Sequence, residues 1–548
     1  MRRRVTDSLK IKLYRRKFIL VLISFMLAQI FHAQATTIGL LGIDNDEVAE
    51  GFTLFTPWYS ARSFLINNCG QVIREWEHEI EEGLANSYLD IEGNLHLLRN
   101  EVFSLYDWDG NRLTSFTGEA WDMNFHHDFT ILPNGHVIIL FDEKITINEA
   151  LELGVDSTLF VEQQDHMVID GFAEFDLSDP DSITLVWEWH LKHHLIQDIN
   201  PLLSNFFESA ERPRRLNINF TSALYSLLDW THFNGVDYNP ELDQLVFSSR
   251  SSSEIYIIDH STTTSEAADS VGGTYGFGGD FLWRWGNPAQ YGQDSSLQQT
   301  FVQHNPNWNL YGPNTQEGMS LFNNENATNS ASSSILTVVP QKDSDGNYIF
   351  ENGRFGPDEP EWKYEGPEEE FFSPIMSSAQ LLNNGNYISC LGRFGKFYEI
   401  TPEGKRVWQY QNPIFIGPVP QFQTAPPSIT FSIQKYPLDF LGFEGKDLSP
   451  NSILENFNSI SNGCIQATAN ENLSFETESK VYPNPTSDYI HITSERTTTS
   501  YEIYDVYGKL ISKNNFNSKI DISNLPKGSY FLKLQSISHS EIHQIIIH

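Results

Sequence analysis

One strand pattern recurs along most of this chain and restricts the fold more than any other feature. Between residues 36 and 450, an apolar strand, a turn with Asn-Gly or Asp-Gly, a second strand and an aromatic strand ending in Trp repeat with variation. The segment from Ser377, SSAQLLNNGNYISCLGRFGKFYEITPEGKRVWQYQNP, holds two hairpins, closed at Asn384-Gly385 and Glu403-Gly404. About four strands in such a unit make one blade of a β-propeller.

The repeats predict an all-β chain whose main domain, residues 36–450, is a six-bladed β-propeller around a central channel. Seven blades are the alternative count. A β-sandwich or a parallel β-helix is the alternative architecture. We prefer the propeller because neither of these explains the regular glycine turns together with the terminal tryptophans.

Three further segments flank this domain. Arg15, Arg16 and Lys17 precede the apolar run FILVLISFMLA, and Ala33-Gln34-Ala35 follows it, which predicts a signal peptide over residues 1–35. Residues 451–478 are rich in Asn, Ser, Glu and Thr and form a predicted linker. Residues 479–548 alternate in polarity as a small β-sandwich does. No segment after the signal is apolar enough to span a membrane, so we expect an exported, soluble protein.

The chain carries 71 acidic and 35 basic side chains, a formal net charge of -36. Such a surface repels nucleic acid and anionic lipid headgroups, so neither is an expected partner. The segment DSDGN at Asp343 to Asn347 has oxygen ligands at calcium-like spacing but lacks the later glutamate of a full loop. The sequence also lacks a phosphate-cradling glycine motif and zinc-type spacing. We therefore predict neither a metal nor a cofactor.

Three cysteines would meet an oxidising compartment after export. Cys390 lies in the strand pattern NYISCLG and is expected to be a buried apolar residue. Cys69 and Cys464 lie in turn-like sequence, and a bridge between them would tie the start of the main domain to its end. The sequence leaves open whether this bridge forms.

A predicted hairpin brings a histidine and an arginine together. His232 precedes the first strand, Pro240 to Asp243 form the turn, and the second strand runs to Arg250. Antiparallel pairing around this turn places Phe233 opposite Arg250, with His232 beside it. A neutral imidazole next to a planar guanidinium suits the binding of a small oxyanion.

The tail contains YPNPTSDYI at Tyr482 to Ile490, YDVYGKLI at Tyr504 to Ile511, and ISNLPKGSYFLKL ending at Leu534. In these motifs it closely resembles the C-terminal sorting domain of the type IX secretion system of Bacteroidetes. It implies recognition by the type IX machinery and passage through the periplasm and across the outer membrane. The protein is then expected to be secreted or attached to the outer surface.

The main domain contains the phrases HHDFTILPNGH, DWTHFNGVDYNPELDQLVFSSR, SSSEIYIIDHSTT, GGDFLWRWGNPAQYG, and FVQHNPNW with SLFNNEN downstream. In these phrases it resembles the arylsulfotransferase family of bacterial aryl-sulfate sulfotransferases. The resemblance implies a six-bladed propeller that moves sulfuryl groups between phenols without a nucleotide sulfate donor. Relatives often continue the last histidine phrase into a glycine-rich segment, whereas this chain reads NWNLYGPNTQEGMSLF.

By motif position, the resemblance implies that His304 is the nucleophile that forms a sulfohistidine. His232 and Arg250 take the positions of the sulfate-binding histidine and arginine, and a further histidine falls on His126 or His127. Because adjacent strand residues face opposite ways, we expect only one of that pair, His127, to line the channel. His127, His232 and Arg250 would then stabilise the charge on the transferred oxygens.

Several further side chains are candidates for binding the aryl ring of the substrate. They are His126, Trp230, Phe233, Trp308 and Tyr311, and blade packing is the alternative role for each aromatic residue. Two other functions stay open from the sequence. One is a non-catalytic surface propeller that binds glycans or aromatic ligands, and the other is a quinone-dependent dehydrogenase, for which a clear cofactor set is lacking.

Overall fold

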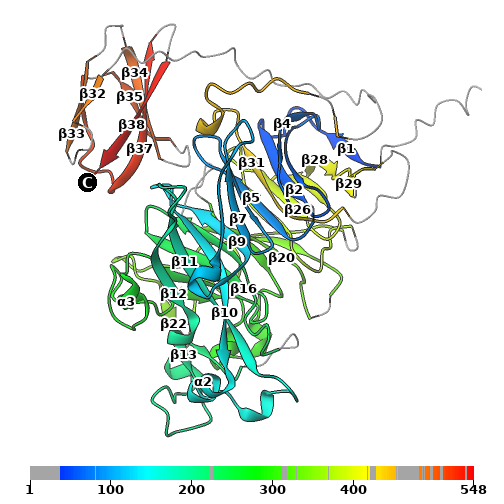
Figure 1. Ribbon diagram of the computed structural model, residues 1–548, viewed down its shortest axis with the longest axis vertical. Coiled ribbons are helices and arrows are strands. Elements are labelled where there is room, and N and C mark those ends of the chain that lie inside the picture. The colour runs from blue at the N-terminus through cyan, green and yellow to red at the C-terminus, as the bar shows by residue number, and fades with distance from the viewer. Residues whose placement is uncertain are drawn as a thin grey trace, which may run out of the picture.

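The computed structural model gives an all-β protein (Figure 1). The structure describes residues 37–451 except 81, 221–225, 310–317, 329, 368–369, 416 and 420–427, then 453–454. It also describes 480–547 except 484–485, 487, 494–497, 506–509, 517 and 537–539. The predicted signal peptide, most of the predicted linker, Cys464 and Tyr311 lie outside these residues.

In the described part of the main domain, six antiparallel sheets of four or five strands succeed one another. Each sheet is given from its inner strand outward. The first sheet contains β31 (Thr430–Tyr436), β2 (Phe52–Pro57), β3 (Arg62–Asn67) and β4 (Val72–Glu77), and the second contains β5 (Ala85–Leu89), β6 (Leu95–Arg99), β7 (Val102–Tyr106) and β8 (Arg112–Thr117). The third sheet contains β9 (Asn124–Ile131), β10 (Val137–Thr146), β11 (His166–Asp176) and β12 (Thr184–His190).

The other three sheets follow the same order. The fourth sheet contains β15 (Phe233–Asn239), β16 (Gln244–Ser249), β17 (Glu254–Asp259) and β18 (Trp283–Trp285). The fifth contains β19 (His304–Trp308), β20 (Met319–Asn323), β21 (Ser334–Val338) and β24 (Trp362–Glu365). The sixth contains β25 (Ser378–Leu381), β26 (Tyr387–Leu391), β27 (Lys396–Ile400), β28 (Arg406–Gln411) and β1 (Gly39–Ile43). β31, near the C-terminal end of the domain, is therefore the inner strand of the first sheet. β1, at the N-terminal end of the domain, is the outer strand of the last sheet.

Short elements decorate these sheets. The paired strands are β13 (Leu195–Ile196) with β14 (Leu216–Asn217), β22 (Phe350–Glu351) with β23 (Arg354–Phe355), and β29 (Ile414–Phe415) with β30 (Gly417–Pro418). The helices are α2 (Ile147–Glu152) and α3 (Thr264–Ala267), with 3₁₀ turns η1 (Gly118–Trp121), η2 (Ser157–Leu159), η3 (Leu191–His194), η4 (Ser209–Glu211), η5 (Pro288–Tyr291), η6 (Ser295–Leu297) and η7 (Leu441–Phe443). None of the described helices is long and apolar enough to cross a membrane.

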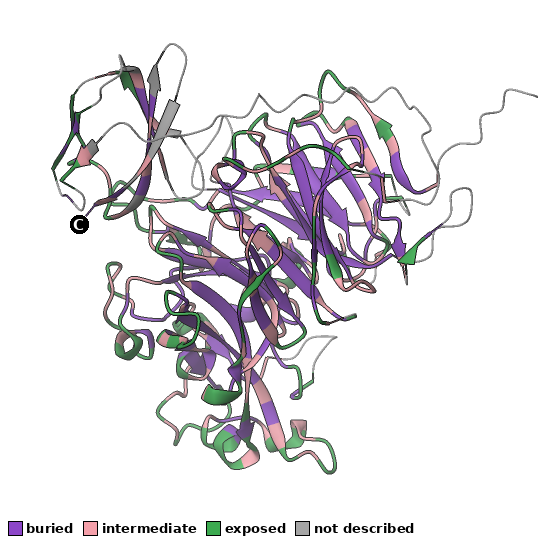
Figure 2. Ribbon diagram, turned by 45° about the horizontal axis from the view of Figure 1, so that its top comes forward, coloured by how far each residue is buried: buried purple, intermediate pink, exposed green. Residues whose placement is uncertain are grey.

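The tail folds into two small sheets around an apolar core. One contains β32 (Lys480–Tyr482), β33 (Tyr489–Thr493) and β36 (Lys519–Asp521), and the other β35 (Leu510–Asn515), β34 (Thr498–Asp505), β37 (Gly528–Ser536) and β38 (Ser540–Ile547). Buried isoleucines such as Ile490, Ile503 and Ile545 fill the space between them. Figure 2 shows buried residues concentrated in the strands of the main domain and in the described strands of the tail.

The tryptophans that end the repeated phrase lie on outer strands and donate hydrogen bonds to the backbone of the next sheet. The indole Nε1 of Trp76 donates to Asp107 O at 3.0 Å, that of Trp362 to Pro402 O at 2.8 Å, and that of Trp408 to Asn68 O at 2.8 Å. The last bond joins the sixth sheet to the first. The repeated Trp therefore has a physical role, because each one fastens two neighbouring sheets.

Inner strands of successive sheets also contact one another, in the order β31, β5, β9, β15, β19, β25 and back to β31. Buried polar side chains bridge them. Asp128 on β9 accepts from Tyr88 Oη at 2.9 Å and from the Val236 backbone N–H at 3.1 Å, and Asp237 on β15 accepts from the Trp308 backbone N–H at 2.8 Å. Burial raises the pKa of Asp128 and that of Asp237 to about 7 despite these donors.

The cysteines differ in state. Cys69 is disulfide-bonded, whereas Cys390 is a buried free thiol in β26. Burial raises the pKa of the Cys390 thiol well above its usual value, as expected for a residue that acts as a small apolar group. The other predicted participant, Cys464, lies outside the described residues.

We predict that Trp408→Phe lowers the free energy of unfolding by about 1 kcal/mol, because it removes one indole hydrogen bond while keeping an aromatic ring. Thermal and urea unfolding would measure the change. Trp121→Phe is the matched control, since the Trp121 ring packs on Phe116 and Phe175 and its indole makes no hydrogen bond to the described residues. Equal losses for the two variants would contradict this role of Trp408.

Candidate active site

The starts of three neighbouring inner strands bring the predicted histidines together. His127 lies near the start of β9, His232 immediately precedes β15, and His304 opens β19. The His127 and His232 rings are 4.6 Å apart between centroids. Burial lowers the pKa of His127 well below its usual value, and the charges of His232, His126, His304 and Arg250 lower it further. The structure therefore brings five predicted site residues together in one cluster: His126, His127, His232, His304 and Arg250.

His126 and His127 are in direct contact, although strand alternation predicts that adjacent side chains point to opposite faces. Ile139 pairs with Phe129 and Phe141 with Phe125, which leaves three residues of β9 opposite the single residue Leu140. This bulge and a positive φ of 53° at His127 break the alternation of an ordinary strand. The two Nδ1 atoms consequently lie 2.8 Å apart.

A carboxylate contacts the other ring nitrogen of His126. His126 Nε2 lies 3.0 Å from Asp170 Oδ1 in an ion-pair contact. Burial lowers the pKa of His126, but the interactions with Asp170 outweigh it and the net shift is upward, which favours the doubly protonated ring. In that form His126 Nδ1 donates to His127 Nδ1. The proton of neutral His127 then resides on Nε2, where it can be donated to an anion.

The hairpin that carries His232 and Arg250 forms as predicted, with a different register. Asn239 pairs with Gln244, so the turn falls where expected, but Phe233 pairs with Ser249 and not with Arg250. A bulge between Phe233 and Gly235 causes the shift. The Arg250 backbone N–H donates to the His232 carbonyl at 3.1 Å. Arg250 is therefore adjacent to His232 in the hairpin.

Acidic groups lie near both His232 and Arg250. His232 Nδ1 lies 2.7 Å from Asp229 Oδ2, which orients the ring and directs Nε2 away from this carboxylate. Burial lowers the pKa of Arg250, opposed by the charges of Asp229 and Glu325. The half-buried Arg250 has no ion pair within salt-bridge distance among the described residues. Its forked donors can therefore bind a tetrahedral anion.

His304 is fully buried and held in one orientation. Asn324 donates its amide hydrogens to Ser373 O at 2.8 Å and Met376 O at 2.9 Å, so its Oδ1 must point to His304 Nδ1, 2.7 Å away. His304 Nδ1 also lies 3.1 Å from Val302 O. Two acceptors on one side fix the proton on Nδ1. Nε2 keeps its lone pair.

This lone pair is directed at a backbone amide. The Met376 N–H donates to His304 Nε2 at 3.2 Å, from a segment in which Met376 and Ser377 have φ values of 57° and 91°. Burial lowers the pKa of His304 to about 3, with the hydrogen bond to Asn324 opposing the shift and the charges of Arg250 and His232 adding to it. His304 is therefore neutral at physiological pH, which a nitrogen nucleophile requires.

Glycine at position 235 allows the neighbouring sheets to meet at this point. A Cβ there would lie 2.9 Å from Asn305 Cα and 2.6 Å from Pro306 Cδ, directly behind His304. Asn305 itself has a φ of 54°. Positive φ values therefore occur at or beside three of the cluster residues, which is common where strain positions functional groups.

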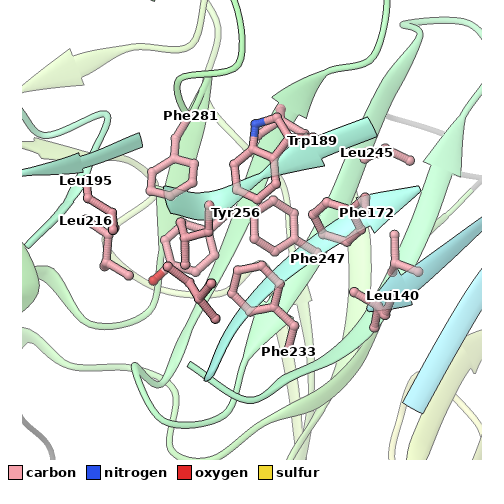
Figure 3. Close-up of a cluster of buried hydrophobic side chains, with 14 of the residues drawn as sticks. Leu140, Phe172, Trp189, Leu195, Leu216, Phe233, Leu245, Phe247, Tyr256 and Phe281 are labelled. Carbon is pink, nitrogen blue, oxygen red and sulfur yellow. The ribbon is translucent and has the colours of Figure 1, made fainter. Parts of the chain in front are cut away.

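The predicted aromatic contacts do not join the cluster. Phe233 is 1% exposed and packs between Phe172 and Phe247 in the core (Figure 3), and Trp230 belongs to the same core. Trp308 packs in a different apolar core at the far end of β19. These side chains stabilise the sheets, as their alternative role implied. Tyr311 lies outside the described residues.

Sequence reasoning missed the residues that orient the cluster. Asn324 lies in SLFNNEN, and Asp229 lies in DWTHF, so both fall within phrases already singled out. Asp170, by contrast, comes from the middle of β11 with no distinctive surroundings. The backbone amide of Met376 leaves no signal in a sequence at all.

The chain has only distant similarity to solved structures. No curated protein matches the chain. Among solved structures, a protein of unknown function from Bacteroides caccae is 12% identical over 70% of this chain and 98% of its own, with a TM-score of 0.38. A streptogramin B lyase is 9% identical over 74% and 95%, with a TM-score of 0.34, and the β-propeller domain of Cps50 (Swd1) from Myceliophteria thermophila is 9% identical over 68% and 91%, with a TM-score of 0.33.

Two family models match, and together they span most of the chain. Residues 480–548 match the secretion system C-terminal sorting domain, which indicates export and a secreted or surface location. Residues 43–414 match the arylsulfotransferase (ASST) model, well over half of the sequence. The chain therefore belongs to the arylsulfotransferase family.

Proposed function

We propose that the protein moves a sulfuryl group from an aryl sulfate to a phenol through a sulfohistidine on His304. Family membership supports an aryl sulfotransferase activity in general. The observation that carries the specific mechanism is the neutral His304 ring, which Asn324 holds through Nδ1 and which lies near Arg250, His232 and His127. No nucleotide, metal or other cofactor is part of the proposal.

In the first half-reaction, the Nε2 lone pair attacks sulfur while the bond from sulfur to the aryl oxygen breaks. The phenolate leaves with the bonding electrons. The ring nitrogens then share one positive charge, which the carbonyl oxygen of Asn324 stabilises through the Nδ1 proton. In the second half-reaction, the oxygen of an acceptor phenol attacks sulfur, its proton goes to solvent, and the electrons of the N–S bond return to Nε2.

Three groups stabilise the charge on the transferred sulfuryl oxygens. Arg250 supplies a fixed cation, His232 an imidazole oriented by Asp229, and His127 the Nε2 proton left by its bond to His126. The Met376 N–H donates to the Nε2 lone pair in the resting state and must release it before Nε2 attacks sulfur. Donors fixed before the reaction stabilise the transition state without reorganisation.

We also propose the scaffold and route of export. The scaffold is a six-bladed propeller over residues 36–450, supported by the ring of inner-strand contacts and by β31, which supplies the inner strand of the first sheet. A signal peptide over 1–35 would direct passage through the periplasm. The linker 451–478 would connect the propeller to a sorting domain over 479–548.

His304→Gln is predicted to lower kcat for transfer from 4-nitrophenyl sulfate to phenol by ~10⁴-fold or more, because the nucleophile is lost. Nitrophenol release followed by absorbance measures the effect. His166→Gln, a partly exposed histidine paired with Asp165, is the control and should keep full activity. Retention of activity by the His304 variant would refute the assigned nucleophile.

Asn324→Ala should reduce kcat by about 10²-fold, because His304 loses its fixed orientation. Asn324→Asp provides a second readout. A carboxylate at Nδ1 stabilises the protonated His304 ring and should move the acid limb of the pH profile to higher pH. Asn326→Ala is the control from the same loop, as its amide bonds only to nearby serines and Asn323. An unchanged acid limb in Asn324→Asp would contradict the proposed contact.

The rate of enzyme sulfation should stay flat from neutral pH down to pH 5. The folded-state pKa of His304 is about 3, so its neutral, nucleophilic form persists far below the usual histidine range and is lost only as the pH falls through about 3. The burst rate of nitrophenol release in rapid mixing measures this step. A decline centred near pH 6.5 would show that the attacking histidine titrates normally.

A further inference from the structure

The inner strands differ in chemistry at the ends where they start. Three successive strands, β9, β15 and β19, carry the site histidines at or next to their starts. The other three, β25, β31 and β5, start beside apolar side chains. Met376 lies shortly before β25, Ile429 and Phe431 flank the first residue of β31, and Leu84 immediately precedes β5. One side of this end therefore offers nitrogen atoms and the other side offers hydrocarbon.

Seven residues form this apolar cluster: Trp58, Tyr59, Leu84, Ile375, Met376, Ile429 and Phe431. Backbone hydrogen bonds join the segments that contribute to it. The Ser377 N–H donates to the Phe431 carbonyl at 3.0 Å, and the Trp58 N–H donates to the Ile429 carbonyl at 2.9 Å. Trp58, Tyr59, Leu84 and Ile375 are only partly buried, so the cluster keeps apolar surface that a bound molecule can cover.

The apolar cluster adjoins the site histidines at two points. The Phe431 ring lies 6.0 Å from the His127 ring between centroids. The Met376 N–H donates to His304 Nε2 at 3.2 Å, while the Met376 side chain belongs to the apolar cluster. A small molecule held by these histidines would therefore meet hydrocarbon on this side.

An aryl sulfate divides in the same way. Its sulfate is an oxyanion that requires hydrogen-bond donors, whereas burial of its ring against hydrocarbon is favourable. A single oxygen atom joins the two parts, so a sulfate bound by the histidines and Arg250 leaves its ring close to Phe431 and Met376. No residue of the apolar cluster carries a charge, and burying an unpaired charge there would be costly.

We propose that the apolar cluster binds the aryl ring of the sulfate donor and selects uncharged rings. This assignment rests on the proposed sulfotransferase function. It takes the place of the aromatic contacts expected from the sequence, because Trp230, Phe233 and Trp308 pack in other cores. The partly exposed Trp58 and Tyr59 offer aromatic faces suited to ring contacts.

A charge introduced at Leu84 tests the assignment, since β5 carries none of the site histidines. The two donors are 4-carboxyphenyl sulfate and its methyl ester, and the readout is the ratio of their kcat/KM values, acid over ester. The unchanged protein should favour the ester. Leu84→Arg should raise the ratio about tenfold, because the new cation attracts the carboxylate, and Leu84→Glu should lower it. A ratio measured within one variant is independent of the folded fraction.

Leu113→Arg is the matched control, because it places the same side chain at an exposed leucine of β8, outside the apolar cluster. Its ratio should equal that of the unchanged protein. Unchanged ratios in both Leu84 variants, with transfer from the ester intact, would overturn the ring assignment alone. Preference of the unchanged protein for the acid would overturn the selectivity. Absence of transfer from either donor by the unchanged protein would overturn the proposed function, and the ring assignment with it.

Discussion

The hydrogen bonds between inner strands are the constraint on which the site depends. Asp128 and Asp237 each reach from one sheet to a backbone amide of the next, and the outer tryptophans do the same at the rim. Burying a carboxylate is costly, as the raised pKa values of both groups show, and the backbone donors offset part of that cost. Once the sheets are fixed in this way, the starts of β9, β15 and β19 lie at the same end of neighbouring inner strands.

Local departures from ideal strand geometry turn this meeting point into a chemical site. The bulge at His126 and His127 brings two adjacent imidazoles into contact, and positive φ values occur at His232 and at Asn305, which follows His304. Burial keeps His304 neutral while Arg250 stays charged. A neutral nucleophile beside a fixed cation is the combination that attack on a sulfate ester requires.

Much of the architecture follows from the sequence because it rests on short-range patterns. Glycine turns and terminal tryptophans predict the hairpins, and family resemblance selects His304, His232 and Arg250, which the structure brings together. The predicted pairing of Phe233 with Arg250 is wrong because it assumes an unbroken register, which a bulge interrupts. Asp170 and the Met376 amide are contributed by tertiary contacts that no local pattern encodes.

The central claim concerns one atom, Nε2 of His304. The enzyme is trapped with an aryl sulfate, and peptide mapping locates the residue that carries the sulfuryl group. ¹⁵N NMR of histidine-labelled protein then distinguishes the two ring nitrogens. We predict a single sulfuryl group on Nε2 of His304, with Nδ1 still protonated. A group on Nδ1, on His127 or on His232, or no covalent product during turnover, would contradict the account.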